Sequence, residues 1–293
     1  MQQVMQYLDM FQKTIKYPVS CYGIGVHSGQ TVQITLKPAR ADSGIIFIRT
    51  DISGENHVLA SYSNVSETSL STTISNKNLF SISTIEHLMA AIWGSDIDNI
   101  IIEIDGPEVP IMDGSSKPFV FMLDCAQPQI LNAKRKYLKI LREVTVSGDK
   151  GSENIVLPNE AFMVDINIDF ASKAIGKQSL QYNNKMLFNT EIAAARTFGF
   201  VEELDYLQNN GLARGASLNN AIGIDKDIIL NHDGLRFKDE FVKHKLLDAI
   251  GDISLGAQNI IGNFILTKPG HNINNLLLRK IFDNPNNYCW ITL

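Results

Sequence analysis

The stretch Phe241-Val-Lys-His-Lys-Leu-Leu-Asp-Ala-Ile-Gly-Asp252 places three side chains capable of chemistry four residues apart, at His244, Asp248 and Asp252. Residues four apart share one face of a helix. At about 100° per residue, this polar face lies roughly opposite an apolar stripe. The stripe consists of Val242, Leu246, Ala249, Ile250 and Ile253. An imidazole nitrogen and a carboxylate oxygen at this spacing can converge on one cation, and zinc accepts such ligands.

A solvated helix face with a His/Asp pair is the competing interpretation, and taken alone the spacing is more typical of it. The polar face, however, also carries Phe241, Gly251 and Leu255. A solvated face seldom collects such residues together, and a partly enclosed site fits them better. His244 and Asp248 are therefore candidate metal ligands.

The composition of the chain is typical of a globular protein with about two domains, each with a core of its own. Of its 293 residues, 44% are hydrophobic and 19% are charged. No apolar run reaches the ~18 residues that a membrane span needs, and the N-terminal stretch lacks the basic start and apolar middle of a signal peptide. We therefore expect a cytoplasmic protein without stable membrane insertion.

The cysteines and the net charge exclude further classes. Cys21, Cys125 and Cys289 are odd in number and widely spaced, which indicates reduced thiols rather than a disulfide framework or a cysteine zinc site. The net charge of -5 argues against nucleic acid as a partner. A local basic patch at Lys243 and Lys245 could still hold a phosphate.

Hydrophobic periodicity and turn residues outline the same order of elements at the end of each half of the chain. The first half is predicted to contain two strands within 32–48, a helix over 83–93, a buried strand over 99–104 and a helix through 122. The second half is predicted to contain strands within 137–146 and 162–170, a short helix near 191, a helix from about 238, a strand over 263–267 and a helix over 272–282.

Both halves thus close with a helix, a strand, a glycine-containing loop and a helix. This repetition predicts an α+β protein made of two duplicated α/β sandwich domains. We expect the domains at 1–130 and 131–293, with the linker near 126–136.

Six blocks of the sequence carry a resemblance to a known family, and they occur in the family's order. They are Gly25-Val-His-Ser-Gly29, Thr84-Ile-Glu-His-Leu-Met-Ala-Ala91, Pro110-Ile-Met-Asp-Gly-Ser115, Ala195-Arg-Thr-Phe-Gly-Phe200, His244-Lys-Leu-Leu-Asp-Ala-Ile-Gly-Asp252 and Gly270-His-Asn-Ile-Asn-Asn275. In them the chain resembles the UDP-3-O-acyl-N-acetylglucosamine deacetylases over nearly its whole length.

The resemblance implies a zinc amidase that removes acetate from an acylated UDP-sugar in the committed step of lipid A biosynthesis. It also implies the duplicated sandwich, with the helices of the two domains packed together and the active site at their interface. We expect one Zn²⁺ per chain, a monomer, and the deacetylase alone, without the dehydratase domain to which some members are fused. The match is poorer over 171–184, where the family lines the acyl passage, so the sequence does not give the acyl length. The first ~15 residues are assigned no role.

The metal ligands that the resemblance implies are His87, His244 and Asp248, with a fourth position open for water. An open site of this kind lowers the pKa of bound water toward ~7 and polarises a carbonyl, as amide hydrolysis requires. On its own, a single histidine one turn into a helix is more often structural. The Glu86-His87 pair beside the distant His-x-x-x-Asp reverses that preference.

Glu86 has two competing interpretations. The spacing from Ser83 to Glu86 matches a capping box, in which the carboxylate binds the backbone N–H of Ser83. The family instead uses this glutamate as the general base that takes a proton from water. We favour the catalytic role.

The remaining catalytic residues also follow from the resemblance. His271, held by Asp252, is protonated and assists the leaving amine or the oxyanion, whereas a capping or surface imidazole is the simpler interpretation of a histidine in this loop. The hydroxyl of Thr197 can donate to the developing oxyanion, although a loop threonine is usually a turn residue.

Four further residues are expected to contact the substrate. Phe198 could stack on the sugar and Lys245 could neutralise the diphosphate, with core packing and a solvated cation as the simpler interpretations. Leu70 and Val26 would lie along the acyl passage. His27 matches the family near the substrate, and its role stays open.

Two other classes of function compete with the deacetylase. A catalytically idle nucleotide-sugar or lipid binding protein on the same fold is disfavoured because every residue that the chemistry requires is present. A metal-free hydrolase that uses His244 and Asp252 as a dyad lacks an obvious serine or cysteine nucleophile in a strained turn.

Overall fold

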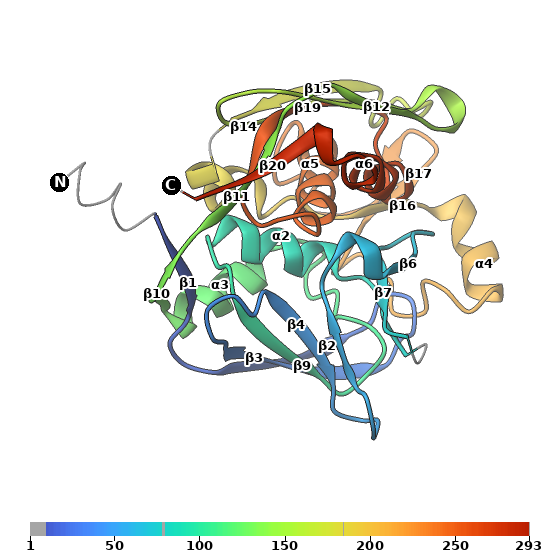
Figure 1. Ribbon diagram of the computed structural model, residues 1–293. Coiled ribbons are helices and arrows are strands. Elements are labelled where there is room, and N and C mark those ends of the chain that lie inside the picture. The colour runs from blue at the N-terminus through green and yellow to red at the C-terminus, as the bar shows by residue number, and fades with distance from the viewer. Residues whose placement is uncertain (1–9, 78–79, 184, 293) are drawn as a thin grey trace.

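Two α+β halves stack through their helices in the computed structural model, which describes residues 10–77, 80–183 and 185–292 (Figure 1). One sheet lies at each outer side of the molecule, and the main helices lie between the sheets. The first nine residues, part of the segment to which no role was assigned, fall outside the described ranges.

The N-terminal sheet has five strands. Its order is β2 (Val19–Ile24), β3 (Thr31–Pro38), β9 (Ile100–Ile104), β4 (Ile45–Arg49) and β5 (His57–Leu59). In β4 and β9 buried and half-buried residues alternate, because successive side chains of a strand point to opposite faces of the sheet. The fully buried face covers the helices.

The C-terminal sheet has seven strands. They are β11 (Lys136–Ile140), β12 (Val144–Ser147), β13 (Glu153–Leu157), β14 (Phe162–Asp169), β15 (Lys177–Tyr182), β19 (Ile260–Thr267) and β20 (Tyr288–Thr292). Strand β19 is the centre of this sheet. Its last residues pair with β13 and β14, and its first residues pair with β11, which in turn pairs with β20.

Five strands of the C-terminal sheet repeat the N-terminal sheet. The orders β2-β3-β9-β4-β5 and β12-β13-β19-β14-β15 correspond strand by strand. In each set the central strand is parallel to one neighbour and antiparallel to the other, and both outer pairs are antiparallel. The predicted duplication is therefore present in topology as well as in element order.

The helices repeat in the same way. They are α2 (Glu86–Gly94) and α3 (Lys117–Ala126) on the N-terminal side, and α5 (Glu240–Ile253) and α6 (His271–Asp283) on the C-terminal side. Helices α2 and α5 each lead directly into the central strand of their sheet, which is parallel to β4 in the first half and to β14 in the second. Helices α3 and α6 follow that strand.

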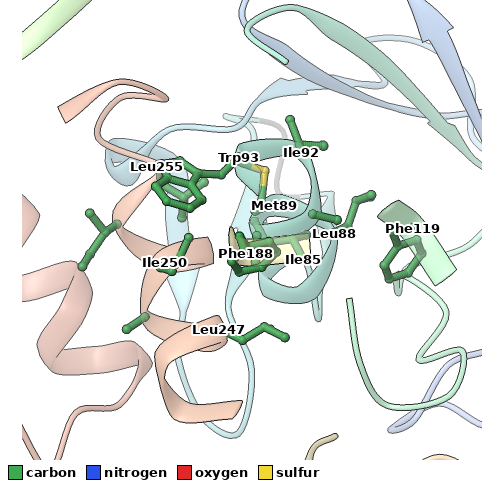
Figure 2. Packing of buried hydrophobic residues seen from close by; sticks show 14 of the residues in the cluster. Ile85, Leu88, Met89, Ile92, Trp93, Phe119, Phe188, Leu247, Ile250 and Leu255 are labelled. Carbon is green, nitrogen blue, oxygen red and sulfur yellow. The ribbon is translucent and has the colours of Figure 1, made fainter. Parts of the chain in front are cut away.

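Helices α2 and α5 pack against each other and join the two halves into one hydrophobic core. Figure 2 shows side chains of both helices in this core, among them Met89, Leu247 and Ile250. Close approach depends on Gly251, where a β-carbon would overlap the backbone carbonyl oxygen of Glu86. The side chain that is missing at residue 251 thus lets α5 lie directly against the start of α2.

Three smaller sheets complete the fold. They are β1 (Phe11–Ile15) with β10 (Pro128–Lys134), then β6 (Val65–Glu67), β7 (Thr73–Ser75) and β8 (Ser81–Ile82), and finally β16 (Phe198–Phe200), β17 (Ile222–Asp225) and β18 (Ile228–Ile229). The first one contains the expected linker, which is a strand over most of its length. The third one carries α4 (Val201–Asn209), which Figure 1 shows at the periphery of the molecule.

The predicted long helices and central strands are confirmed, whereas the short helix predicted near 191 is a π-helical turn over Phe188–Ile192 and strands such as β2, β13 and β20 were not predicted. Two further differences concern 137–146 and α4. The segment predicted to carry strands over 137–146 turns at residues 141–143, and β11 and β12 pair with different neighbours. Helix α4 was not predicted, because it has no buried residue and its sequence is as polar as a loop. Within the described ranges, no helix is both long enough and apolar enough to cross a membrane.

Candidate metal centre and active site

Helices α2 and α5 bring His87, His244 and Asp248 together. His87 is the second residue of α2, and the other two lie one turn apart on α5. The Nε2 atoms of both histidines lie 3.4 Å from Oδ1 of Asp248. One potential ligand atom from each residue falls within 4.8 Å of the others. The three residues predicted to hold a metal therefore form one group.

These three side chains are buried, so the interpretation of the α5 polar face as solvated is wrong. His87, His244 and Asp248 are 4%, 2% and 5% exposed. Burial lowers the pKa of His244 to about 4, although Asp248 acts against it, so this imidazole is neutral at pH 7. Its Nδ1 lies 3.1 Å from the carbonyl oxygen of Ala195, which fixes the tautomer and directs Nε2 toward the group.

The donor set fits a divalent metal ion. Burial opposes ionisation of Asp248, but His244 and Lys245 beside it hold the pKa of this carboxyl well below its usual range. Its Oδ1, which faces both histidines, is buried without a hydrogen-bond partner, as is Nδ1 of His87. Two imidazoles and one carboxylate around an unsatisfied oxygen are the ligands that zinc takes at open sites.

Glu86 faces the same centre and does not cap its helix. The backbone N–H of Ser83 donates to the carbonyl of Pro107, and no side chain caps the start of α2. Instead, Oε2 of Glu86 accepts the backbone N–H of Thr72 at 3.0 Å. Burial raises the pKa of Glu86, against the opposing effects of His271 and His87. A raised pKa suits a carboxylate that must accept a proton near neutral pH.

His271 and Asp252 form the pair that the resemblance implies. His271 begins α6, and its Nδ1 lies 2.8 Å from Oδ2 of Asp252. Its Nε2 lies 3.9 Å from Oε1 of Glu86. Burial alone would lower the pKa of His271, but the carboxylates of Asp252 and Glu86 raise it to about 9. The imidazole is therefore protonated at neutral pH.

A cavity of ≈ 470 Å³ opens onto this group. It is lined by the three candidate ligands, by Glu86 and His271, and by all five residues predicted to contact the substrate or its oxyanion. Those five are Val26, Leu70, Thr197, Phe198 and Lys245. Asp252 does not line the cavity and contacts it only through its hydrogen bond with His271. Most of the remaining lining is apolar and comes from the β16–β18 region and α4, as in a passage for an aliphatic chain.

Three of these lining residues have partners that limit their role. Lys245 binds Oδ2 of Asp248 at 3.0 Å, so it is not the solvated cation of the simpler interpretation. Phe198 packs edge-on against Phe241, with ring centroids 5.0 Å apart, so it belongs to the core and to the cavity wall at once. The backbone of Thr197 is fixed on both sides by hydrogen bonds to Gly114 and Ile222.

His27 lines the cavity and Glu108 lies beneath its loop; the sequence left the role of the first open and gave no role to the second. Glu108 is 1% exposed and accepts the backbone N–H groups of His27 and Ser28, each at 2.8 Å. A β-carbon at residue 25 would overlap the same carboxylate. The glycine at this position was the one local signal that a buried group lies beneath the loop.

A model of the UDP-3-O-acyl N-acetylglycosamine deacetylase family matches residues 12–283, from the first strand of the structure to the last long helix. The chain belongs to this family. The match covers both halves and every residue of the metal and catalytic groups described above.

Curated members of the deacetylase family are similar along the whole chain. UDP-3-O-acyl-N-acetylglucosamine deacetylase from Pasteurella multocida (strain Pm70) is 46% identical over 285 residues, which cover 96% of this chain and 93% of the relative. The enzymes of that name from Haemophilus influenzae (strain PittEE) and Colwellia psychrerythraea (strain 34H / ATCC BAA-681) are 45% and 43% identical at the same coverage. The resemblance of the six sequence blocks is thereby confirmed.

Proposed function

We propose that this chain is a zinc-dependent deacetylase that hydrolyses the N-acetyl group of UDP-3-O-acyl-N-acetylglucosamine, giving UDP-3-O-acyl-glucosamine and acetate. In the family this is the committed step of lipid A biosynthesis. One observation carries the proposal beyond family membership. A buried His-His-Asp group, a buried glutamate and a protonated histidine converge on a single cavity with an apolar extension.

His87, His244 and Asp248 would hold one zinc ion. Zinc held there would polarise the amide carbonyl and make water a stronger nucleophile at neutral pH. The hydrogen bond of His244 to Ala195 and the ion pair of Asp248 with Lys245 keep both ligands oriented toward the centre.

Proton transfer is assigned to Glu86 and His271. Glu86 accepts a proton as the water oxygen bonds to the amide carbon, and the hydroxyl of Thr197 donates to the oxyanion that develops. His271 then gives its proton to the amine nitrogen as the carbon–nitrogen bond breaks. The ion pair with Asp252 keeps His271 protonated for this step.

Substrate binding is assigned to the rest of the cavity wall. Lys245, held at the metal group, supplies positive charge for the diphosphate, and Phe198 in the cavity wall stacks on the sugar. Val26 and Leu70 line the route of the acyl chain, and the half-exposed side chain of Leu70 leaves that route open to solvent.

Neither of the other two functions fits as well. Asp252 bonds to His271, Thr72 and Asn274, so it is not the partner of His244 in a metal-free dyad. Membership of an enzyme family supports the deacetylase rather than an idle binding protein. A cytoplasmic location and a monomeric state remain predictions, and sedimentation of the purified chain tests the second.

Acetate release by the purified protein tests the function. It is measured on UDP-3-O-acyl-N-acetylglucosamine after chelation, and again after one equivalent of zinc is added back. Activity that is lost and then restored supports the reaction and the metal together. Activity indifferent to chelation would overturn the metal assignment, and a folded, zinc-loaded protein that releases no acetate from substrates of several acyl lengths would overturn the reaction.

A further inference from the structure

Thr72 donates hydrogen bonds to two carboxylates of the site, those of Glu86 and Asp252. Its backbone N–H binds Oε2 of Glu86 at 3.0 Å, and its hydroxyl binds Oδ1 of Asp252 at 2.6 Å. Thr72 is 2% exposed and immediately precedes β7, in the N-terminal half. Asp252 belongs to α5, in the C-terminal half. One residue thus connects the two carboxylates across the interface between the halves.

The second carboxylate has a complete set of donors. Oδ1 of Asp252 accepts the hydroxyl of Thr72, and Oδ2 accepts His271 and the side-chain amide of Asn274, each at 2.8 Å. The Asn274 amide is oriented in turn, because its oxygen accepts Nδ2 of Asn154 at 2.8 Å. An ionised carboxylate can only accept hydrogen bonds, so each of these donors fixes its position.

Hydrogen bonds link Glu86, Thr72, Asp252 and His271 in that order, so that the two ends of the series approach each other and nearly complete a ring. The open link is the 3.9 Å between Nε2 of His271 and Oε1 of Glu86, which faces the cavity where a substrate amide would lie. Thr72 is the uncharged member of this series. Its two hydrogen bonds set the spacing of the Glu86 and Asp252 carboxylates, and Thr72 itself takes no part in the transfer of protons.

We propose that Thr72 is a positioning residue for the deacetylation, which aligns Glu86 and the Asp252–His271 pair by bonding to a carboxylate from each half of the molecule. The inference rests on the proposed function, since it assigns roles relative to that reaction. Asn274 supports it by holding the other oxygen of Asp252.

Substitution of the hydroxyl separates this role from a merely structural one. Thr72→Val keeps the backbone N–H to Glu86 and the shape of the side chain, and removes only the donor to Asp252. We expect kcat to fall roughly 10- to 100-fold, as for loss of a hydrogen bond to a charged group, with KM unchanged. Thr72→Ser keeps the hydroxyl and should restore kcat to within a few-fold of the parent.

Thr73→Val is the matched control, because Thr73 is the next residue and lies outside the cavity lining. Its kcat should equal that of the parent. If Thr72→Val does not fold, Thr72→Ala removes the same donor with less apolar contact against the carboxylate. Equal losses in the valine and serine variants, or a rise in KM with kcat preserved, would overturn the positioning role.

A second measurement does not depend on turnover. In the chelated protein, the Nδ1–H proton of His271 reports its bond to Asp252 by NMR. A carboxylate with fewer donors binds each remaining donor more strongly, so this resonance should move in Thr72→Val and return in Thr72→Ser. An unmoved resonance would overturn the proposal even if the parent deacetylates the substrate. A moved resonance in a parent without deacetylase activity would place the fault in the proposed function instead.

Discussion

The two halves of the molecule share one topology and contribute differently to the site. Helices α2 and α5 occupy equivalent places, each before the central strand of its sheet. Helix α2 supplies Glu86 and His87 from its first two residues, whereas α5 supplies His244, Asp248 and Asp252 from one face of its middle and last turns. The equivalent helices thus contribute site residues from different places, the N-terminus of α2 and one lateral face of α5.

This difference teaches how a repeated fold can build one asymmetric centre. The start of α2 is stabilised without a side-chain cap, so Glu86 remains available to the cavity. The face of α5 is buried against α2, so its polar residues have no solvent and must find partners in the centre. Neither half contains all three of the proposed metal ligands. The site therefore exists only where the halves meet.

Removal of one ligand from each half should produce the largest effects. We expect His87→Gln and His244→Gln to lose bound zinc and at least about 1000-fold in turnover, because either change leaves two protein ligands. Metal content by elemental analysis and acetate release check this. His232→Gln, at a fully exposed histidine, is the control. Full zinc and full turnover in one of the two variants would show that its half is dispensable.

Loss of Glu86, the proposed general base at the start of α2, should have the next largest effect. Glu86→Gln keeps the size and the bond to Thr72 but cannot accept a proton, so turnover should fall roughly 10²- to 10⁴-fold with zinc and melting temperature retained. Glu160→Gln, at an exposed glutamate, is the control. A variant that melted early yet kept its turnover would assign Glu86 to the structure of the helix.

The contribution of Asp252, on α5, to its pair with His271 can be tested through the pH dependence of turnover. Asp252 and Glu86 raise the pKa of His271 to about 9 against the effect of burial, so the protonated form that the proposed mechanism uses is lost as the pH rises through that value. Asp252→Asn removes one of the two charges, which lowers the pKa of His271. The alkaline limb of the pH–rate profile should then move to lower pH, and His271→Ala should flatten it. An alkaline limb unchanged in both variants would remove His271 from the mechanism.

The contact between the two helices should have the smallest effect. Gly251→Ala pushes α5 away from the backbone of Glu86, and overpacking of this kind costs about 1–3 kcal/mol of unfolding free energy. Denaturant unfolding and turnover should both decline. Gly270→Ala is the control for stability, since a β-carbon there meets no neighbour. Unchanged turnover in Gly251→Ala would mean that the spacing of the helices tolerates adjustment.

The elements that carry the ligands were predictable because their signals are local. The apolar period around Leu246 and Ile250 marked α5, and the apolar run over 100–104 marked β9. The placement of His244 and Asp248 on one face follows from the helix itself. The capping-box spacing at Ser83 was misleading, because both groups have tertiary partners. The backbone N–H of Ser83 donates to the carbonyl of Pro107, and the carboxylate of Glu86 accepts the backbone N–H of Thr72.

The partners of the site were not predictable in this way. Thr72, Asn274 and Asn154 are ordinary polar residues in sequence. The docking of the halves brings Thr72 to Asp252, and the packing of α6 and β13 within the C-terminal half adds Asn274 and its partner Asn154. The peripheral helix α4 was not predicted for a different reason. It buries nothing, so no apolar period marks it.

The insertion of the central strand into each sheet has a consequence for the order of folding. β3 and β4 follow one another in the chain but lie on opposite sides of β9, and β13 and β14 do the same around β19. Each sheet can therefore close only after a distant strand has been synthesised, a topology that slows folding. The N-terminal sheet can close while the C-terminal one is still being made. Until β19 arrives, the nascent chain exposes the pairing edges of β13 and β14, and during this interval it is most exposed to misassembly.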